Sequence, residues 1–135
     1  MTAPARRLTP LTLVSGGHAS LREAAIAQAL PPGQSNAVIL EGLADGNSIL
    51  ADLADLAEHT SPPAALQLLR IAPGCLCCSG NLVLRVTLNR LLRHPPAHLF
   101  LSLADATHIE QLRSWLAASP YDAWLALEPE LTVTA

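Results

Sequence analysis

Charged residues are scarce in this chain, and neither sign is in large excess. Of its 135 residues 14% are charged and 50% are hydrophobic, and the formal net charge is −3. Such an apolar composition excludes a disordered tail. The lack of a basic excess removes the electrostatic footprint that a nucleic-acid-binding protein needs. We therefore expect one compact domain over residues 1–135, with no nucleic-acid partner.

Long apolar runs are also missing. The pair Arg6-Arg7 precedes apolar residues as in an export signal, but Pro10 and Gly16-Gly17 interrupt the run that follows. The run is left with about five residues, which is too short for a signal or a membrane span. No other stretch approaches the roughly 18 consecutive apolar residues of a spanning helix. We expect a cytoplasmic protein with no membrane partner.

Short apolar runs alternate with longer segments of helical periodicity. Five runs predict strands, over 11–16, 37–42, 66–72, 98–104 and 122–128. Four segments predict helices, over 20–30, 47–59, 81–94 and 107–119. The strand runs are apolar throughout rather than alternating, which is typical of parallel strands covered on both faces. The order therefore predicts a three-layer α/β domain with a mostly parallel sheet of about five strands.

The first predicted helix carries recognisable boundary signals. Ser20 precedes Glu23 by three residues, which is the spacing of a capping box. Pro31 and Pro32 follow the helix and cannot continue it. We therefore expect Ser20 and Glu23 to cap this helix from its first turn.

Cysteine is rare, and all of it lies in one place. The three cysteines Cys75, Cys77 and Cys78 stand in "GCLCCSG", between the third predicted strand and a helix. An odd number of thiols cannot build a disulfide framework. That position is the carboxyl edge of an open α/β sheet, where ligands bind. Clustered thiolates favour Zn²⁺ or Cu(I), and three of them need a fourth ligand from the chain, from water or from a second protomer.

The cysteine triplet is also compatible with two roles that involve no metal. Free cysteine is commonly an interior residue, so the three side chains can be small buried hydrophobes. Cys75 and Cys78 have the C-x-x-C spacing of a redox disulfide. Spacing alone therefore leaves a metal site, a packed interior cluster and a redox pair as alternatives.

The segment "GCLCCSGNL" resembles the G-C-x-C-C motif of the CobW family, P-loop GTPases related to UreG and HypB that handle metals such as zinc and cobalt. The similarity extends along nearly the whole chain: "LTLVSGGHASLREAAIAQAL" resembles the first strand, phosphate-binding loop and first helix, and "AVILEG" the second strand with its N-E pair. The resemblance implies a P-loop-NTPase-like fold. It also implies a metal role for Glu41, which matches the glutamate of the N-E pair.

The phosphate-binding loop departs from the family pattern. Laid without gaps on G-F-L-G-A-G-K-T-T-L, the chain reads "GGHASLREAA" from Gly16 and Gly17 onward. Leu21 then replaces the last glycine, Arg22 the lysine and Glu23 the magnesium-binding threonine. A P-loop binds phosphate through backbone N–H groups, a lysine and a hydroxyl, so these changes predict that nucleotide binding is lost.

Nucleotide hydrolysis is expected to be lost as well. Ser102 replaces the glutamate of the family's E-T-S-G segment. Ala135 comes before the family's N-K-x-D segment, which reads guanine, and the resemblance does not reach the family's C-terminal domain. The resemblance therefore implies no catalytic residue here.

The remaining polar candidates are weaker. Glu41 can also be a solvated carboxylate at a strand end, and His18 can be an exposed loop residue rather than a ligand. The other histidines are expected at the surface: His59, His94, His98 and His108. Three arginines are expected on a solvated helix face that can alternatively dock an acidic partner: Arg85, Arg90 and Arg93.

Together the sequence predicts a degenerate CobW-like protein that binds a thiophilic metal, zinc above copper(I) or cobalt, through Cys75, Cys77, Cys78 and Glu41. It would act as a metal carrier, buffer or accessory to a metallochaperone GTPase, with a complete CobW-family GTPase, a metalloprotein client or a second copy as partner. An atypical GTPase completed by a partner chain, and a thiol redox or structural interaction protein, remain the alternatives.

Overall fold

The computed structural model describes residues 8–31, 34–42, 50, 66–71, 82–104, 107, 109–118 and 120–134. Its strands are β1 (Thr9–Ser15), β2 (Asn36–Glu41), β3 (Leu66–Ile71), β4 (His98–Ser102), β5 (Leu125–Leu127) and β6 (Leu131–Thr132). Its helices are α1 (Ala19–Ala29), α3 (Leu82–Leu91), α4 (Ile109–Ala117) and the 3₁₀ turn η1 (Tyr121–Ala123). The alternation of strands and helices predicted from the sequence is therefore confirmed in these ranges.

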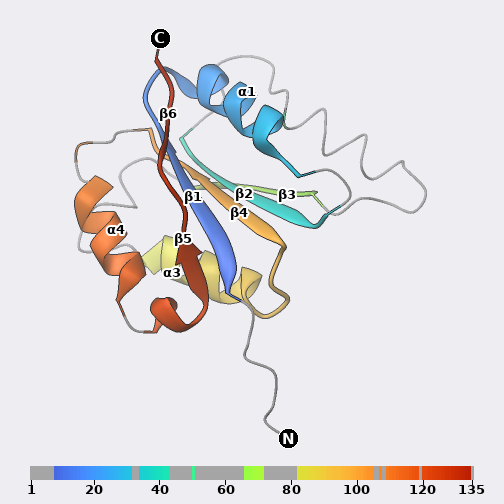
Figure 1. Ribbon diagram of the computed structural model, residues 1–135, viewed down its shortest axis with the longest axis vertical. Helices are drawn as coiled ribbons and strands as arrows, with labels where there is room; N and C mark the ends of the chain where they lie inside the picture. Colours follow the sequence, from blue (N-terminus) through green and yellow to red (C-terminus); the bar gives the residue numbers. More distant parts are fainter. Residues whose placement is uncertain are drawn as a thin grey trace, which may run out of the picture.

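The strands form one sheet in which every pair is parallel among the residues described. Its order is β3-β2-β4-β1-β5, and β6 pairs with the end of β1 (Figure 1). Parallel pairing follows from the apolar runs: β2 is buried at every position, as a strand must be when helices cover both faces. The prediction of a mostly parallel α/β sheet is confirmed.

Two apolar clusters lie on opposite faces of the sheet and make it the middle of three layers. Alternate residues of one strand enter different clusters: Ala37 and Ile39 pack with α3 and α4, whereas Val38 and Leu40 pack with Ile26 of α1. Figure 1 accordingly shows α1 on one face and α3 and α4 on the other. The side chains on both faces of β2 thus have a helix to pack against.

One apolar face of α4 packs against the sheet. Leu112 and Leu116 are buried, and Ile109 and Trp115 pack against the same cluster. The predicted helix over 47–59 lies outside the described residues except for Leu50, which is helical and fully buried.

The fifth predicted strand is shorter than expected. Residues 121–123 form η1, and β5 begins only at Leu125. Pro120 occupies the N-cap position of this turn with a helical backbone, and Asp122 and Ala123 are exposed. Pro120 has no N–H group to donate to a neighbouring strand, which favours a turn over an extended strand here.

The connections place a topological switch point between β1 and β4. The connection through α1 leads from β1 to β2, on one side of the sheet, while the connection through α4 leads from β4 to β5, on the other side. In open α/β sheets ligands bind beside the carboxyl ends of the strands at such a point. Here those ends carry Gly16 and Ser102.

No helix in the described part of the chain is long and apolar enough to cross a membrane.

Candidate functional site at the carboxyl edge

The turn after β1 is short. β1 ends at Ser15 and α1 begins at Ala19, so residues 16–18 make the whole connection. Gly16 and Gly17 have φ of 88° and 57°, a backbone region that residues with a Cβ seldom adopt. Residues 19–25 already belong to α1. The backbone between β1 and α1 therefore consists of three residues.

Arg22 fills the space beneath this turn. Its side chain is buried, with 4% of the residue exposed. Nη1 donates to the carbonyl oxygens of Gly17 at 2.7 Å and Gly16 at 3.2 Å, and Nε donates to Oγ of Ser102 at 2.9 Å. One guanidinium thus ties the first turn of α1 to the turn after β1 and to the end of β4.

The polarity of this arrangement is opposite to that of a phosphate site. A P-loop directs N–H groups toward an anion. Here the carbonyl oxygens of two glycines converge on a cation, while the N–H groups of Leu21 and Arg22 donate to the carbonyl of His18. The turn is therefore built around a positive side chain.

Glu23 does not cap α1, so the predicted capping box is wrong. The helix begins at Ala19 with His18 in the N-cap position and no side-chain cap, and Oγ of Ser20 lies 3.1 Å from Nδ1 of His18. Glu23 is consequently the fifth residue of the helix, too far along to reach its first N–H groups. It is 2% exposed and its carboxylate lies 3.6 Å from the guanidinium of Arg70 on β3.

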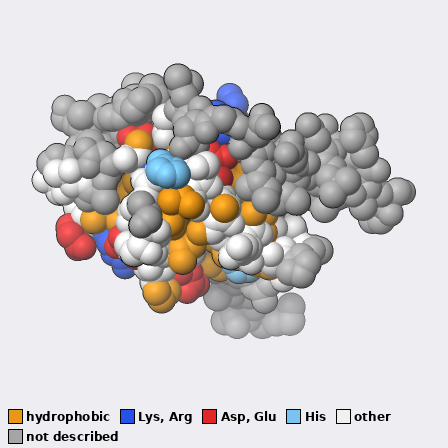
Figure 2. Space-filling model, turned by 90° about the horizontal axis from the view of Figure 1, so that it is seen from above, with side chains coloured by type: hydrophobic (Ala, Val, Ile, Leu, Met, Phe, Trp, Pro, Cys, Tyr) orange, Lys and Arg blue, Asp and Glu red, His pale blue; other side chains and the backbone are white. Residues whose placement is uncertain are grey.

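The C-terminal segment lies against the glycine turn. β6 pairs with β1 through Val14 and Ser15, and the N–H of Val133 donates to the carbonyl of Ser15 at 2.8 Å. The Ser15 hydroxyl donates to Oε1 of Glu130 at 2.8 Å. Figure 1 shows β6 running beside β1 to the C-terminus, and Figure 2 looks down on that edge, where hydrophobic side chains gather in the middle of the face.

Glu41 ends β2 at the same edge. It is 6% exposed, and its Oε1 accepts the N–H of Ala104, two residues after β4, at 2.8 Å. The alternative of a solvated carboxylate is therefore wrong. The cause is that β4 lies next to β2, so its continuation passes over the end of β2 and supplies a donor.

The sheet brings Glu41 next to the strand that leads into the cysteines. Glu41 pairs with Ile71 in the parallel register of β2 and β3, and the N–H of Gly42 donates to the carbonyl of Ile71 at 2.8 Å. Cys75 follows Ile71 by four residues, which span at most about 14 Å of extended chain. Cys75, Cys77 and Cys78 lie outside the described residues, so their sulfur positions stay a prediction.

The other candidates fall in separate places. His18 and His94 are exposed, as are Arg85, Arg90 and Arg93. His98, expected at the surface, is half-buried because it opens β4 beside Asn36 of β2, and its Nδ1 is buried with no hydrogen-bond partner in the described chain. His59 and His108 lie outside the described residues. The described residues contain no group of three side chains placed to hold a metal ion.

No protein-family model, curated protein or solved structure matches this chain. The chemistry of the carboxyl edge is therefore the basis for the function proposed below.

Proposed function

We propose that this protein binds a thiophilic metal ion, zinc above all, as a carrier or buffer, and that it is a degenerate relative of the CobW-type GTPases. The observation that carries the proposal is the burial of Glu41 at the carboxyl edge, where it is paired with Ile71, the last residue of the strand that leads into Cys75. A carboxylate that accepts a backbone N–H is already oriented, and carboxylates that bind metals are commonly held by such hydrogen bonds.

The ligand set suits a cargo ion. Three thiolates and one carboxylate give the four ligands of tetrahedral zinc, and the sulfur-rich set also accepts Cu(I) or cobalt. All three thiols must lose their protons before they bind, so metal is taken up with proton release and given up as the pH falls. The proposal places the protein in the cytoplasm, where thiols remain reduced. A complete CobW-type GTPase or a metalloprotein would then receive the metal.

The geometry of Arg22 supports the loss of the nucleotide function. Arg22 is held by the carbonyls of Gly16 and Gly17 and by Ser102, so this turn directs acceptors at a cation, whereas a phosphate site directs N–H donors at an anion. Arg22 instead reinforces the edge on which the proposed metal site is built. The protein would thus have kept the metal binding of a metallochaperone and lost its GTP binding.

Competition for Zn²⁺ against a chromophoric chelator, in the reduced protein, tests the proposal. Wild type should bind about one ion per chain, or one per two chains if two copies share a site, and more weakly at lower pH. Replacing Cys75, Cys77 and Cys78 with serine should abolish binding without changing the circular dichroism. Wild-type affinity no greater than that of the triple-serine variant would overturn the proposal.

Two matched variants test the role of Glu41. Glu41→Gln keeps an oxygen for the N–H of Ala104, so the fold should be retained while metal affinity falls by about tenfold or more. Glu110→Gln removes an exposed carboxylate from the first turn of α4 and should leave the affinity unchanged. If both variants bind zinc like wild type, water or a second protomer supplies the fourth ligand in place of Glu41.

A further inference from the structure

Three of the four aromatic residues of the chain gather away from the carboxyl edge. The chain has two Trp, one Tyr and one Phe. The rings of Trp115 and Tyr121 lie 4.9 Å apart, and those of Tyr121 and Trp124 lie 5.9 Å apart in an edge-to-face arrangement. The carbonyl of Trp124 accepts the N–H of Thr9, the first residue of β1. The cluster therefore lies by the amino ends of the strands, at the opposite edge from the glycine turn.

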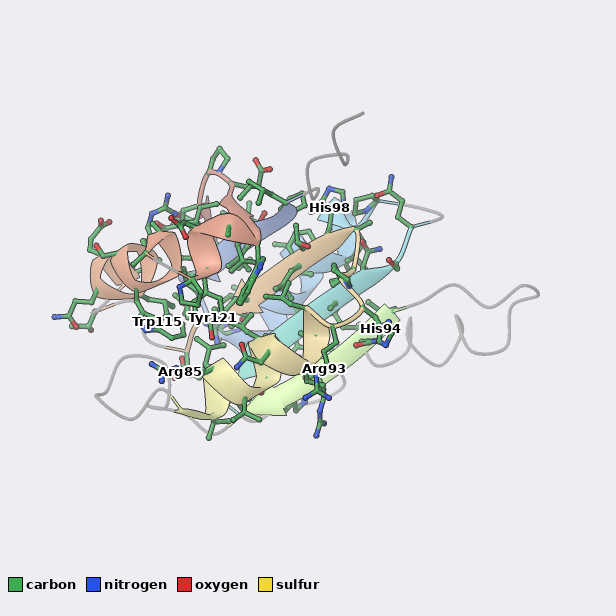
Figure 3. The ribbon with its side chains drawn as sticks, turned by 90° about the horizontal axis from the view of Figure 1, so that it is seen from below. Arg85, Arg93, His94, His98, Trp115 and Tyr121 are labelled. Atoms are coloured by element: carbon green, nitrogen blue, oxygen red, sulfur yellow. The ribbon has the colours of Figure 1, made fainter. Side chains whose placement is uncertain are left out.

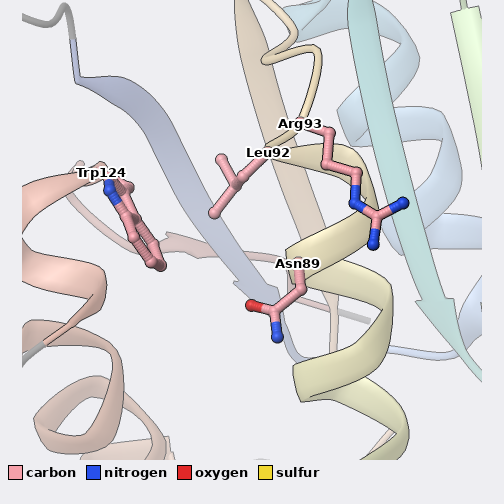
Figure 4. A pocket seen from close by; sticks show the side chains of 4 residues that line it. All are labelled: Asn89, Leu92, Arg93 and Trp124. Carbon is pink, nitrogen blue, oxygen red and sulfur yellow. The ribbon is translucent and has the colours of Figure 1, made fainter.

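This cluster lines two adjoining pockets between α3 and η1. One, of about 400 Å³, is lined by Arg85, Asn89, Trp115, Pro120, Tyr121 and Trp124. The other, of about 300 Å³, is lined by Asn89, Leu92, Arg93 and Trp124 (Figure 4). They share Asn89 and Trp124, and each has the size of a small-molecule site. We call the two together the tryptophan pocket.

The polar groups of the tryptophan pocket present N–H donors. The hydroxyl of Tyr121 donates to Oδ1 of Asn89 at 3.2 Å, which fixes the amide and leaves its NH₂ group able to donate to a ligand. Burial raises the pKa of Tyr121 above its usual value and outweighs the opposing charge of Arg85, which keeps the hydroxyl protonated and donating. Two side-chain donors therefore belong to one wall, Asn89 and Arg85.

Arg85 supplies the charge. Its guanidinium lies 5.9 Å from the centre of the Trp115 ring, a cation–π distance, and Figure 3 shows it beside Trp115 and Tyr121. α3 carries no acidic residue, and Asp122 and Glu110 are exposed and line neither pocket. In Figure 4 the guanidinium of Arg93 is turned away from Trp124, so Arg93 contributes only to the rim.

We propose that the tryptophan pocket binds a small carboxylate with a flat apolar body. The carboxylate would accept hydrogen bonds from Arg85 and Asn89, since a positive charge beside an amide donor favours an anion. The body would lie against the indole of Trp124 and the side chain of Leu92, which face each other across the second pocket (Figure 4). Such a ligand would bind independently of the metal, at the other edge of the sheet.

Titration of the reduced, full-length protein with benzoate tests this inference. Both tryptophans of the chain line the pocket, so the two indole N–H signals in a proton–nitrogen NMR spectrum report on it alone. Benzoate should shift them in a saturable way, with a Kd of about 1 mM or tighter. Benzamide, which has the same shape without the charge, should bind at least about tenfold more weakly. Equal binding of the two probes, or no saturable shift with benzoate, would overturn the proposal.

Two arginines of α3 provide matched variants. Arg85→Gln should remove the preference for benzoate over benzamide, and Arg85→Lys should restore part of it. Arg90→Gln removes another exposed arginine of α3 that lines neither pocket, and this variant should bind benzoate like wild type. If Arg90→Gln weakens benzoate as much as Arg85→Gln does, the anion is held by the general positive charge of α3 and the proposed site is wrong.

Discussion

Nε of Arg22 donates to Oγ of Ser102 at 2.9 Å, and this bond joins α1 to the end of β4 across the switch point of the sheet. Both residues are buried, with 4% and 2% exposed. The residue that the proposed function aligns with the nucleotide-binding lysine of CobW-type GTPases makes an internal polar contact here. Its value to the protein is structural and can be measured as a contribution to the free energy of unfolding.

Arg22→Met should lower the free energy of unfolding by about 2 to 3 kcal/mol. Methionine fills a similar volume but leaves the Ser102 hydroxyl and two glycine carbonyls without their charged donor, and hydrogen bonds to charged groups contribute about 1.5–3 kcal/mol. Urea denaturation followed by circular dichroism measures the change. Arg90→Met, on the exposed face of α3, is the matched control and should stay within about 0.5 kcal/mol of wild type.

A double-mutant cycle isolates the contact with Ser102. Ser102→Ala alone should destabilise the protein, because it leaves Nε of a buried guanidinium without this acceptor. In the Arg22→Met background the same change should cost at least about 1 kcal/mol less. Additive losses would mean that the two side chains do not depend on each other.

Gly16→Ala and Gly42→Ala separate backbone strain from steric contact. Both glycines have positive φ, 88° and 95°. A Cβ at Gly16 would lie 2.2 Å from the carbonyl oxygen of Val133, whereas at Gly42 the nearest contact is the Ala104 Cβ at 3.9 Å. Gly42→Ala should therefore cost about 1 kcal/mol, and Gly16→Ala at least about 1 kcal/mol more, because β6 must move.

Amide hydrogen exchange at Val133 tests whether displacement of β6 causes the larger loss of stability in Gly16→Ala. Its N–H donates to Ser15, so release of β6 should speed its exchange in Gly16→Ala and leave it unchanged in Gly42→Ala. Equal stability of the two alanine variants would show that the C-terminal segment does not press on the glycine turn.

The sheet could be predicted from the sequence, because a short uninterrupted apolar run is compatible with few structures other than a buried strand. β2 was predicted over 37–42 and spans Asn36–Glu41, and β3 was predicted over 66–72 and spans Leu66–Ile71. β6 was missed because it is two residues long and gains its partner only where β5 leaves β1. The β-branched residues of "LTVT" were the available signal.

The contacts of the site were harder to predict from the sequence, because they depend on partners far away along the chain. Nothing local to Arg22 indicates that its acceptor is a serine 80 residues later, or that the glycine carbonyls would turn inward. The prediction that Glu23 caps the helix was wrong because the spacing of Ser20 and Glu23 does not determine where the helix begins. The helix begins at Ala19. Glu41 was placed correctly at a strand end, but its burial depends on Ala104.

Restoring the family residues should not restore nucleotide binding. Neither wild type nor Arg22→Lys with Glu23→Thr should bind GTP with Mg²⁺ more tightly than about 10 μM in calorimetry. Two side chains cannot lengthen a three-residue turn or reverse the carbonyls of Gly16 and Gly17. Circular dichroism must confirm that the double variant is folded. Micromolar GTP binding by either protein would contradict the interpretation of this turn.

Tyr121 should titrate at a higher pH in the folded protein than in the unfolded chain. Burial raises the pKa of Tyr121, and the charge of Arg85 opposes this only in part. Because the folded state favours the protonated phenol, this stabilisation is present below the unfolded pKa of about 10 and is lost as the pH rises through the higher folded value. As Tyr121 is the only tyrosine of the chain, tyrosinate absorbance reports on it alone. The absorbance midpoint should lie above that of the urea-unfolded protein, and Arg85→Gln should move it further upward while Arg90→Gln does not. A folded midpoint at or below the unfolded one would mean that Tyr121 is hydrated and that the wall of the tryptophan pocket is open to water.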